Sequence, residues 1–114
     1  MRKLLYSYSV RHQIPQLKAE FFKALGHPVR IRVLELLTEG ERPVSELLAA
    51  VGIEQPHLSQ QLGVLRRAGL VTARREGPGV VYALADDRVA DLLAVSRAIL
   101  LDLYTVTRDE LQRS

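Results

Sequence analysis

The sequence contains no cysteine among its 114 residues. This absence excludes disulfides, thiolate metal sites, thiol redox switches and cysteine nucleophiles. Long apolar runs are also missing, and none approaches the roughly 20 residues that a helix needs to span a bilayer. The first residues, Met-Arg-Lys-Leu-Leu-Tyr-Ser-Tyr-Ser, are too polar for a secretory signal. We therefore expect a soluble, cytoplasmic protein with no membrane partner.

Charge is modest in total but unevenly distributed along the chain. The formal net charge is +3, yet residues 1–32 carry seven basic residues against the single acid Glu20. Residues 86–114 carry six acids against four arginines. A basic front and an acidic tail suit a protein that presents one side to a polyanion. The length and the 47% apolar content predict one domain with a modest core, of a size that often dimerises.

Apolar spacing, proline or polar starts and glycine stops divide the chain into predicted helices. Residues 1–14 are expected to form a basic N-terminal arm, and residues 15–114 a single folded domain. The predicted helices run from Pro15 to a stop at Gly26, from Pro28 (with His27 as its cap) to Gly40, from a Ser45 cap to Val51, from Pro56 to Ala68 with Gly69 as its cap, and from about Asp86 onward. The last helix is apolar on more than one face, which favours packing on a partner.

The period changes to that of strands in residues 70–84. Residues 70–75 and 80–84 read as strands, and Glu-Gly-Pro-Gly between them is a hairpin signal. A short helix, a polar turn, a second helix and a basic hairpin, in that order, predict a helix-turn-helix with a wing. The expected fold class is mainly α with a small β-hairpin: about five helices and a two-stranded wing.

Polar residues alternate with core positions in the predicted helix 56–68. Leu58, Leu62 and Leu65 have core spacing, so the residues between them are expected on or near the outer face of the first turns. With the residue just before the helix, these are Gln55, His57, Ser59, Gln60 and Gln61. Glutamine can bond adenine through two hydrogen bonds, and serine and histidine can also bond base edges. The alternative interpretation is an ordinary amphipathic helix with a neutral polar face.

Basic residues follow this helix and flank the hairpin tip. Arg66 and Arg67 suit backbone phosphates rather than bases. Arg74 and Arg75 are neighbours on a strand and point to opposite faces, so only one of them should reach DNA directly. Gly77 at the tip allows close approach to a phosphate or a minor groove. The alternative for this segment is a plain solvated hairpin.

Three motifs, in order, resemble those of the ArsR/SmtB family of winged-helix repressors. They are Phe-Lys-Ala-Leu-Gly-His-Pro-Val-Arg-Ile-Arg-Val-Leu-Glu-Leu-Leu at 22–37, Gln-Pro-His-Leu-Ser-Gln-Gln-Leu-Gly-Val-Leu-Arg-Arg-Ala-Gly-Leu-Val at 55–71, and the wing at 75–84. The resemblance covers residues 17 to about 104. It implies a homodimer built by the first and last helices that binds an imperfect inverted repeat in double-stranded DNA. A bound ligand commonly releases members of that family from DNA.

The metal ligands of the family are replaced in this sequence. Members that bind thiophilic metals carry Cys-Val-Cys in the third helix, where this chain has Pro43-Val44-Ser45. The positions that correspond to the zinc-type site on the last helix are Asp86, Arg88, Ile99 and Asp102. Both imidazoles are missing, and an arginine would repel a cation. We therefore predict no metal site of the family type and no cofactor.

The leading interpretation is a sequence-specific DNA-binding regulator, a repressor by analogy with the family, acting as a homodimer. One alternative is a nickel- or zinc-responsive regulator in which His12, on the arm, joins a carboxylate or a second histidine. The arm could instead lie along the partner subunit or reach phosphates. A winged-helix protein–protein module is another alternative. An enzyme is not expected, since the sequence has no nucleophile elbow or metal-hydrolase spacing. Neither an effector ligand nor a partner protein is identified by the residues.

Overall fold

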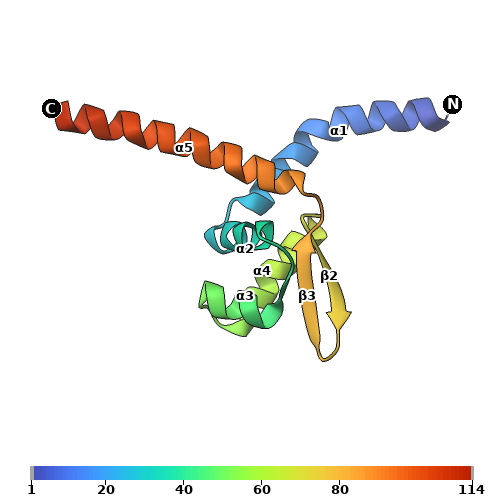
Figure 1. Ribbon diagram of the computed structural model, residues 1–114. Helices are drawn as coiled ribbons and strands as arrows, with labels where there is room; N and C mark the ends of the chain where they lie inside the picture. Colours follow the sequence, from blue (N-terminus) through green and yellow to red (C-terminus); the bar gives the residue numbers. More distant parts are fainter. Residues whose placement is uncertain (1, 114) are drawn as a thin grey trace.

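Two long helices extend in opposite directions from a small body that holds the other elements (Figure 1). This computed structural model describes residues 2–113, with side chains described for residues 13–110, 112 and 113. The elements in chain order are α1 (Arg2–Leu25), α2 (Pro28–Thr38), β1 (Arg42–Pro43), α3 (Val44–Val51), α4 (Gln55–Arg67), β2 (Val71–Glu76), β3 (Gly79–Leu84) and α5 (Arg88–Arg113). The predicted class of five helices with a β-hairpin is confirmed.

The sheet has one more strand than predicted. The hairpin of β2 and β3 is joined by β1, which pairs antiparallel with β3 through Arg42 with Tyr82 and Pro43 with Val81. The two-stranded wing is confirmed, and β1, which was not predicted, extends it to a three-stranded sheet in the order β1-β3-β2. A strand of two residues shows no alternation, and its proline is tolerated because β1 is an edge strand.

Two predicted helix starts were wrong. The first helix begins at Arg2 and contains Pro15, instead of beginning at Pro15. Proline removes one backbone donor inside a helix, but residues 2–14 include no glycine or other proline that would end it. Figure 1 shows α1 changing direction along its length, as a helix with an internal proline does. In α3 the cap is Pro43 rather than Ser45, because β1 holds that proline in an extended conformation immediately before the helix.

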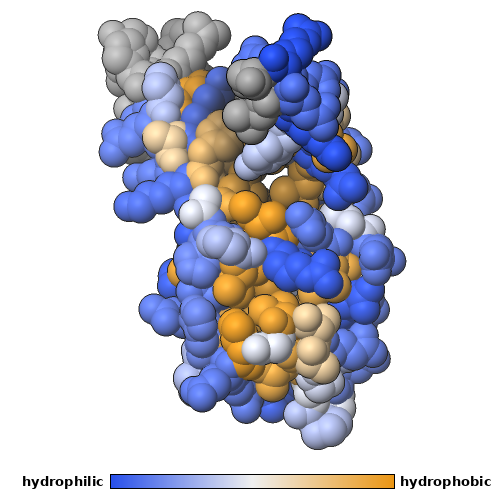
Figure 2. Space-filling view, turned by 90° about the vertical axis from the view of Figure 1, so that its left-hand side faces the viewer, coloured by the Kyte–Doolittle hydropathy of each residue, from blue (hydrophilic) through white to orange (hydrophobic). Residues whose placement is uncertain are grey.

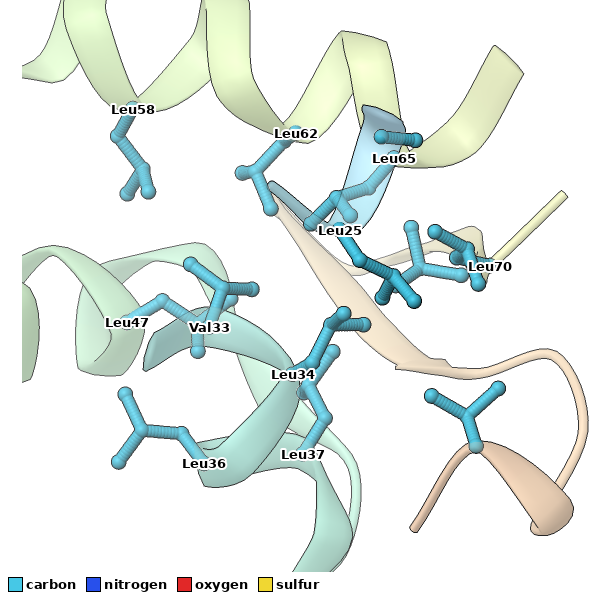
Figure 3. Packing of buried hydrophobic residues seen from close by; sticks show 13 residues of the cluster. Leu25, Val33, Leu34, Leu36, Leu37, Leu47, Leu58, Leu62, Leu65 and Leu70 are labelled. Atoms are coloured by element: carbon cyan, nitrogen blue, oxygen red, sulfur yellow. The ribbon is translucent and has the colours of Figure 1, made fainter. Parts of the chain in front are cut away.

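The core lies between α2, α3, α4 and the base of the sheet. Figure 3 shows Leu58, Leu62 and Leu65 of α4 projecting from one side of the helix into this cluster. The fully buried leucines each stabilise the fold by about 1.5–3 kcal/mol relative to exposed ones. The buried apolar residues are Ala24, Leu25, Val33, Leu34, Leu36, Leu37, Leu47, Leu58, Leu62, Leu65, Leu70, Val71 and Val89. This packing confirms the predicted core positions of α4 and fixes which side of that helix faces solvent.

Local caps set where α2 begins and where α4 ends. The Nδ1 atom of His27 accepts a hydrogen bond of 3.1 Å from the amide of Val29, which confirms the predicted cap of α2. At the end of α4, Gly69 has a φ of +76°, and its amide donates to the carbonyl of Arg66. The amide of Leu70 donates to the carbonyl of Leu65. This pair of bonds is a Schellman motif, so α4 stops at a defined residue and the chain turns into β2.

The last helix is capped by Asp86, as its acidic start predicted. The carboxylate accepts a 2.8 Å hydrogen bond from the amide of Arg88 and also bonds the guanidinium of that arginine. The side-chain and then the backbone hydrogen bonds from Arg88 lower the pKa of Asp86 to about 2. The first residue of α5 is thereby bonded to the residue two positions before it.

Much of α5 carries apolar side chains into solvent. Val95, Ile99, Leu103 and Val106 are 55–58% exposed, and Tyr104 is 71% exposed. Figure 2, which faces the side from which α5 projects, shows apolar side chains gathered along the middle of that face. No helix within residues 2–113 is apolar over enough of its length to cross a membrane. The exposed apolar surface of α5 therefore needs another explanation.

Candidate nucleic-acid interface

The first turns of α4 present a polar surface to solvent. Gln55, His57, Ser59 and Gln60 are exposed, while Leu58 between them is fully buried. Helix α4 is thus amphipathic, with its leucine side fixed in the core and its polar side open. An exposed helix of this kind fits a major groove about 12 Å wide. The structure brings four of the five predicted polar residues to the surface.

Gln61, the fifth, does not lie on the outer face. Its side chain is only 7% exposed, and its Oε1 atom accepts a 2.8 Å hydrogen bond from Nη1 of Arg30 in α2. The reason is helical spacing: position 61 follows Leu58 by three residues and precedes Leu65 by four, which places it on the buried stripe. The prediction that Gln61 faces outward was therefore wrong.

His57 lies at the junction of α4 and α2. Its ring meets the ring of His27 edge to face, with centroids 6.3 Å apart. His57 is exposed, whereas His27 is half-buried and occupied as the cap of α2. The polar surface of α4 is therefore continuous with the start of α2, where a helix N-terminus would meet a phosphate favourably.

Two arginines lie at the end of α4 and both are exposed. The guanidinium of Arg67 folds over Gly63, where an added Cβ would lie 3.1 Å from Nη1. Arg66 is the adjacent exposed cation. The pair forms a basic end to the same helix whose first turns are neutral and polar, an arrangement that suits phosphates at the edge of a groove.

The wing has a tight tip. Glu76 pairs with Gly79, so the connection between β2 and β3 consists of Gly77 and Pro78 alone. Gly77 has a φ of +59°, which residues with side chains rarely adopt and which the first position of a type II′ hairpin turn requires. Both tip residues are exposed. The tip is narrow and free of side-chain bulk at its first position.

The two wing arginines have different surroundings. Arg74 donates two hydrogen bonds to the carboxylate of Glu41, at 2.5 and 2.6 Å, and one of 2.7 Å to Glu76. These bonds raise the pKa of Arg74, and the bond from Arg74 lowers the pKa of Glu41. Arg75 is exposed, and no side chain in the described part of the chain pairs with it. Of the two wing arginines, Arg75 is therefore the one without a partner in the described part of the chain.

The positions that correspond to the family's zinc-type site do not fit a transition metal. The guanidinium of Arg88 occupies the carboxylate of Asp86, with Nη2 and Oδ2 at 2.7 Å. Among the residues that the structure describes, no three His, Cys, Asp or Glu side chains come together. The side chain of His12 lies outside the described residues, so its proposed role as a ligand stays a prediction.

Known proteins are similar to this chain in sequence and in fold. Residues 27–73 match the family described as bacterial regulatory protein, arsR family. The HTH-type transcriptional regulator Rv0081 of Mycobacterium tuberculosis is 60% identical over 86 residues, which are 75% of each chain. Its crystal structure superposes with a TM-score of 0.78 and 55% identity over 82% of this chain and 95% of that one.

Two further solved structures are similar. The transcriptional repressor BigR of Xylella fastidiosa has a TM-score of 0.70 at 39% identity, covering 82% of this chain and 94% of the other. A homodimeric winged helix-turn-helix DNA-binding domain of Mycobacterium bovis has a TM-score of 0.75 at 33% identity, covering 82% and 87%. The resemblance seen in the three sequence motifs therefore extends to whole domains.

Proposed function

Since this chain belongs to the ArsR family of bacterial regulatory proteins, we propose that it represses transcription by binding an inverted repeat in duplex DNA as a homodimer. The observation that carries the proposal is the exposed polar start of α4 beside a wing whose Arg75 is unpaired. Relatives named as repressors support repression rather than activation. Helix α4 enters the major groove, and the wing follows the neighbouring backbone or minor groove.

Within this proposal the residues divide by task. Ser59 and Gln60, in the second turn of α4, contact base edges, with Gln55 and His57 flanking them. The phosphate contacts fall to cations at both ends of the surface. These are Arg66 and Arg67 from α4 and Arg75 from β2, with Gly77 allowing close approach of the wing. Gln61 and Arg74 are left out of the contact set, because each is already bonded within the chain.

Dimerisation supplies the second copy of α4, the helix that reads DNA. The exposed apolar residues of α5, together with Leu17 and Phe22 of α1, offer a surface for a second copy. A twofold axis through that surface would present two copies of α4 to successive turns of DNA, about 34 Å apart. The Mycobacterium bovis relative is a homodimer, which supports this assembly.

Selection from genomic DNA tests the proposal. Purified protein is mixed with sheared DNA of the source organism at about physiological salt, and the bound fragments are sequenced against the input. We expect an enriched inverted repeat whose half-sites are about 10 base pairs, or a multiple, from centre to centre. Bound fragments with no shared sequence would contradict sequence-specific recognition, and absence of binding at low salt would contradict DNA binding altogether.

The wing gives a matched pair of substitutions. Arg75→Ala should weaken binding to the selected operator and to random duplex by similar factors, roughly tenfold at 0.1 M salt, because it removes a phosphate contact from each protomer. The slope of log K against log salt should fall by about two units per dimer. Fluorescence anisotropy of labelled duplexes over a salt series measures both quantities.

The control is the neighbouring arginine. A double variant with Arg74→Gln and Glu41→Gln removes one cation and one anion, so the charge of the cluster with Glu76 is unchanged. Its salt slope should equal that of the unmodified protein, because the charge of Arg74 is neutralised within the chain. Equal loss of slope in the two variants would show that Arg74 also reaches the backbone of DNA.

A further inference from the structure

One side chain, that of Arg30, joins the helices α1, α2 and α4. Arg30 of α2 is half-buried, and its guanidinium donates in three directions. The Nε atom bonds the carbonyl of Ala24 at 2.6 Å, and Nη2 bonds the carbonyl of Lys23 at 3.1 Å, both in the last turn of α1. The third donor, Nη1, bonds Gln61 of α4 at 2.8 Å. A single arginine thus connects the end of α1 to the inner side of α4.

The carbonyls at this helix end have no partner inside their own helix. The last turn of any α-helix leaves its carbonyls unbonded and carries a partial negative charge. Arg30 donates to two of them: the carbonyl of Ala24, and that of Lys23, which also accepts the amide of Gly26 at 3.1 Å. No carboxylate among the described residues pairs with Arg30, so its charge is held by the end of α1 and by a neutral amide. This geometry requires a planar fork of donors, which lysine lacks.

The hydrogen bond of Gln61 depends on the rotation of α4 about its own axis. In the described part of the chain Gln61 is the one buried polar side chain, and its Oε1 atom accepts a hydrogen bond from Arg30. The next residue toward the N-terminus, Gln60, points to solvent. A rotation of α4 about its axis that displaced Gln60 within a DNA groove would also break the hydrogen bond between Gln61 and Arg30, because both glutamines turn with the same helix.

We propose that Arg30 and Gln61 are positioning residues, which hold α4 at the rotation needed to read DNA and tie that rotation to the end of α1. The inference rests on the proposed function, since α4 is taken to read DNA and α1 to contribute to the dimer. It assigns Gln61 no contact with a base. Any displacement of the end of α1 would pass through Arg30 to the reading helix.

Removal of the amide tests the pair in the full-length protein. Gln61→Met keeps the length, the flexibility and the helix propensity of the side chain but loses the acceptor. We expect a folded dimer whose ratio of operator to random-duplex affinity falls roughly tenfold, the size typical of coupled residues. The salt slope on random duplex should not change, since no phosphate contact is lost. Circular dichroism, light scattering and anisotropy supply the three measurements.

The DNA sequence that the Gln61→Met variant selects distinguishes a base contact of Gln61 from a positioning role. When selection is repeated with Gln61→Met, the same inverted repeat should be enriched, only less strongly. A changed preference at one position of each half-site would show that Gln61 touches a base and would overturn the inference. So would a folded variant with the affinity ratio of the unmodified protein.

Two further variants keep the test decisive if Gln61→Met folds poorly. Gln61→Glu retains an acceptor for Arg30 and should restore the affinity ratio to within about twofold of the unmodified protein. Arg30→Lys keeps the charge but cannot span three acceptors, and it should lower the ratio as Gln61→Met does. If Arg30→Lys leaves the ratio unchanged, the pair does not position α4. Failure of the unmodified protein to select any sequence would instead remove the proposed function.

Discussion

Leu103→Asp in α5 is expected to yield a monomer that binds the operator at least about a hundredfold more weakly than the unmodified dimer. Leu103 is 58% exposed and lies on a stripe with Val95, Ile99 and Val106, which are spaced four, four and three residues apart. Their spacing puts all four side chains on one side of the helix. An aspartate there would bury an unpaired charge wherever a second copy packs on the stripe.

The size of the expected loss follows from the symmetry of the site. A dimer engages its second half-site as an intramolecular event, which raises affinity by a factor of about 100 to 10,000 over one reading unit. A monomer loses this factor while each copy of α4 keeps its own contacts. Light scattering after gel filtration gives the mass, and anisotropy on the full operator and on an isolated half-site gives the affinities. Binding to the half-site should change little.

A control with the same charge on the other side of α5 isolates the effect. Thr105 is exposed and follows Leu103 by two residues, which places it on the other side of the helix, one turn before Asp109. Thr105→Asp should therefore leave mass and operator affinity nearly unchanged. If Leu103→Asp stays dimeric and binds the operator normally, the stripe is not the dimer interface. If both variants become monomers, added charge on α5 rather than the loss of an apolar contact is responsible.

The sequence predicts elements whose signals are local. Core spacing placed the leucines of α4, and the glycines at 69 and 77 marked the end of that helix and the tip of the wing. The short strand β1 could not be found, because two residues carry no period and the strand exists only through its pairing with β3. The start of α1 was missed because proline is an equally good first residue of a helix and an internal kink.

In the candidate site, too, some features follow from local sequence signals and others from contacts between residues distant in the chain. Alternation along a strand predicted that only one of Arg74 and Arg75 would reach DNA directly. Which of the two is unpaired depends on Glu41, 33 residues from Arg74 in the chain. The inner position of Gln61 was available from helical spacing alone, since it lies three residues after Leu58. Its bond to Arg30 was not, because that contact spans 31 residues and depends on how α2 packs on α4. Hydrogen bonds between residues distant in the chain therefore determine which wing arginine is unpaired and which residue Gln61 contacts.

Gln60→Ala should remove base discrimination rather than general affinity. A glutamine that holds a base through two hydrogen bonds contributes about 1–3 kcal/mol of discrimination, so operator affinity should fall by a factor of about 5 to 150 per half-site. Binding to random duplex should change little, because no phosphate contact is lost. Repeating the selection with the variant should relax the preference at one position of each half-site. Ser59→Ala is expected to act in the same direction with a smaller effect, since serine bonds a base through one hydroxyl.

The matched control is a second exposed glutamine that lies outside the surface of α4 proposed to read DNA. Gln112 is exposed near the end of α5, and Gln112→Ala should leave both affinities unchanged. Equal losses on operator and random duplex for Gln60→Ala would mean that this side chain meets the backbone of DNA. An unchanged operator affinity would remove Gln60 from the interface and, with it, the assignment of the outer face of α4 as the surface that reads sequence. The comparison with Gln61→Met then separates the two neighbours by role, because only the outward side chain should change which bases are preferred.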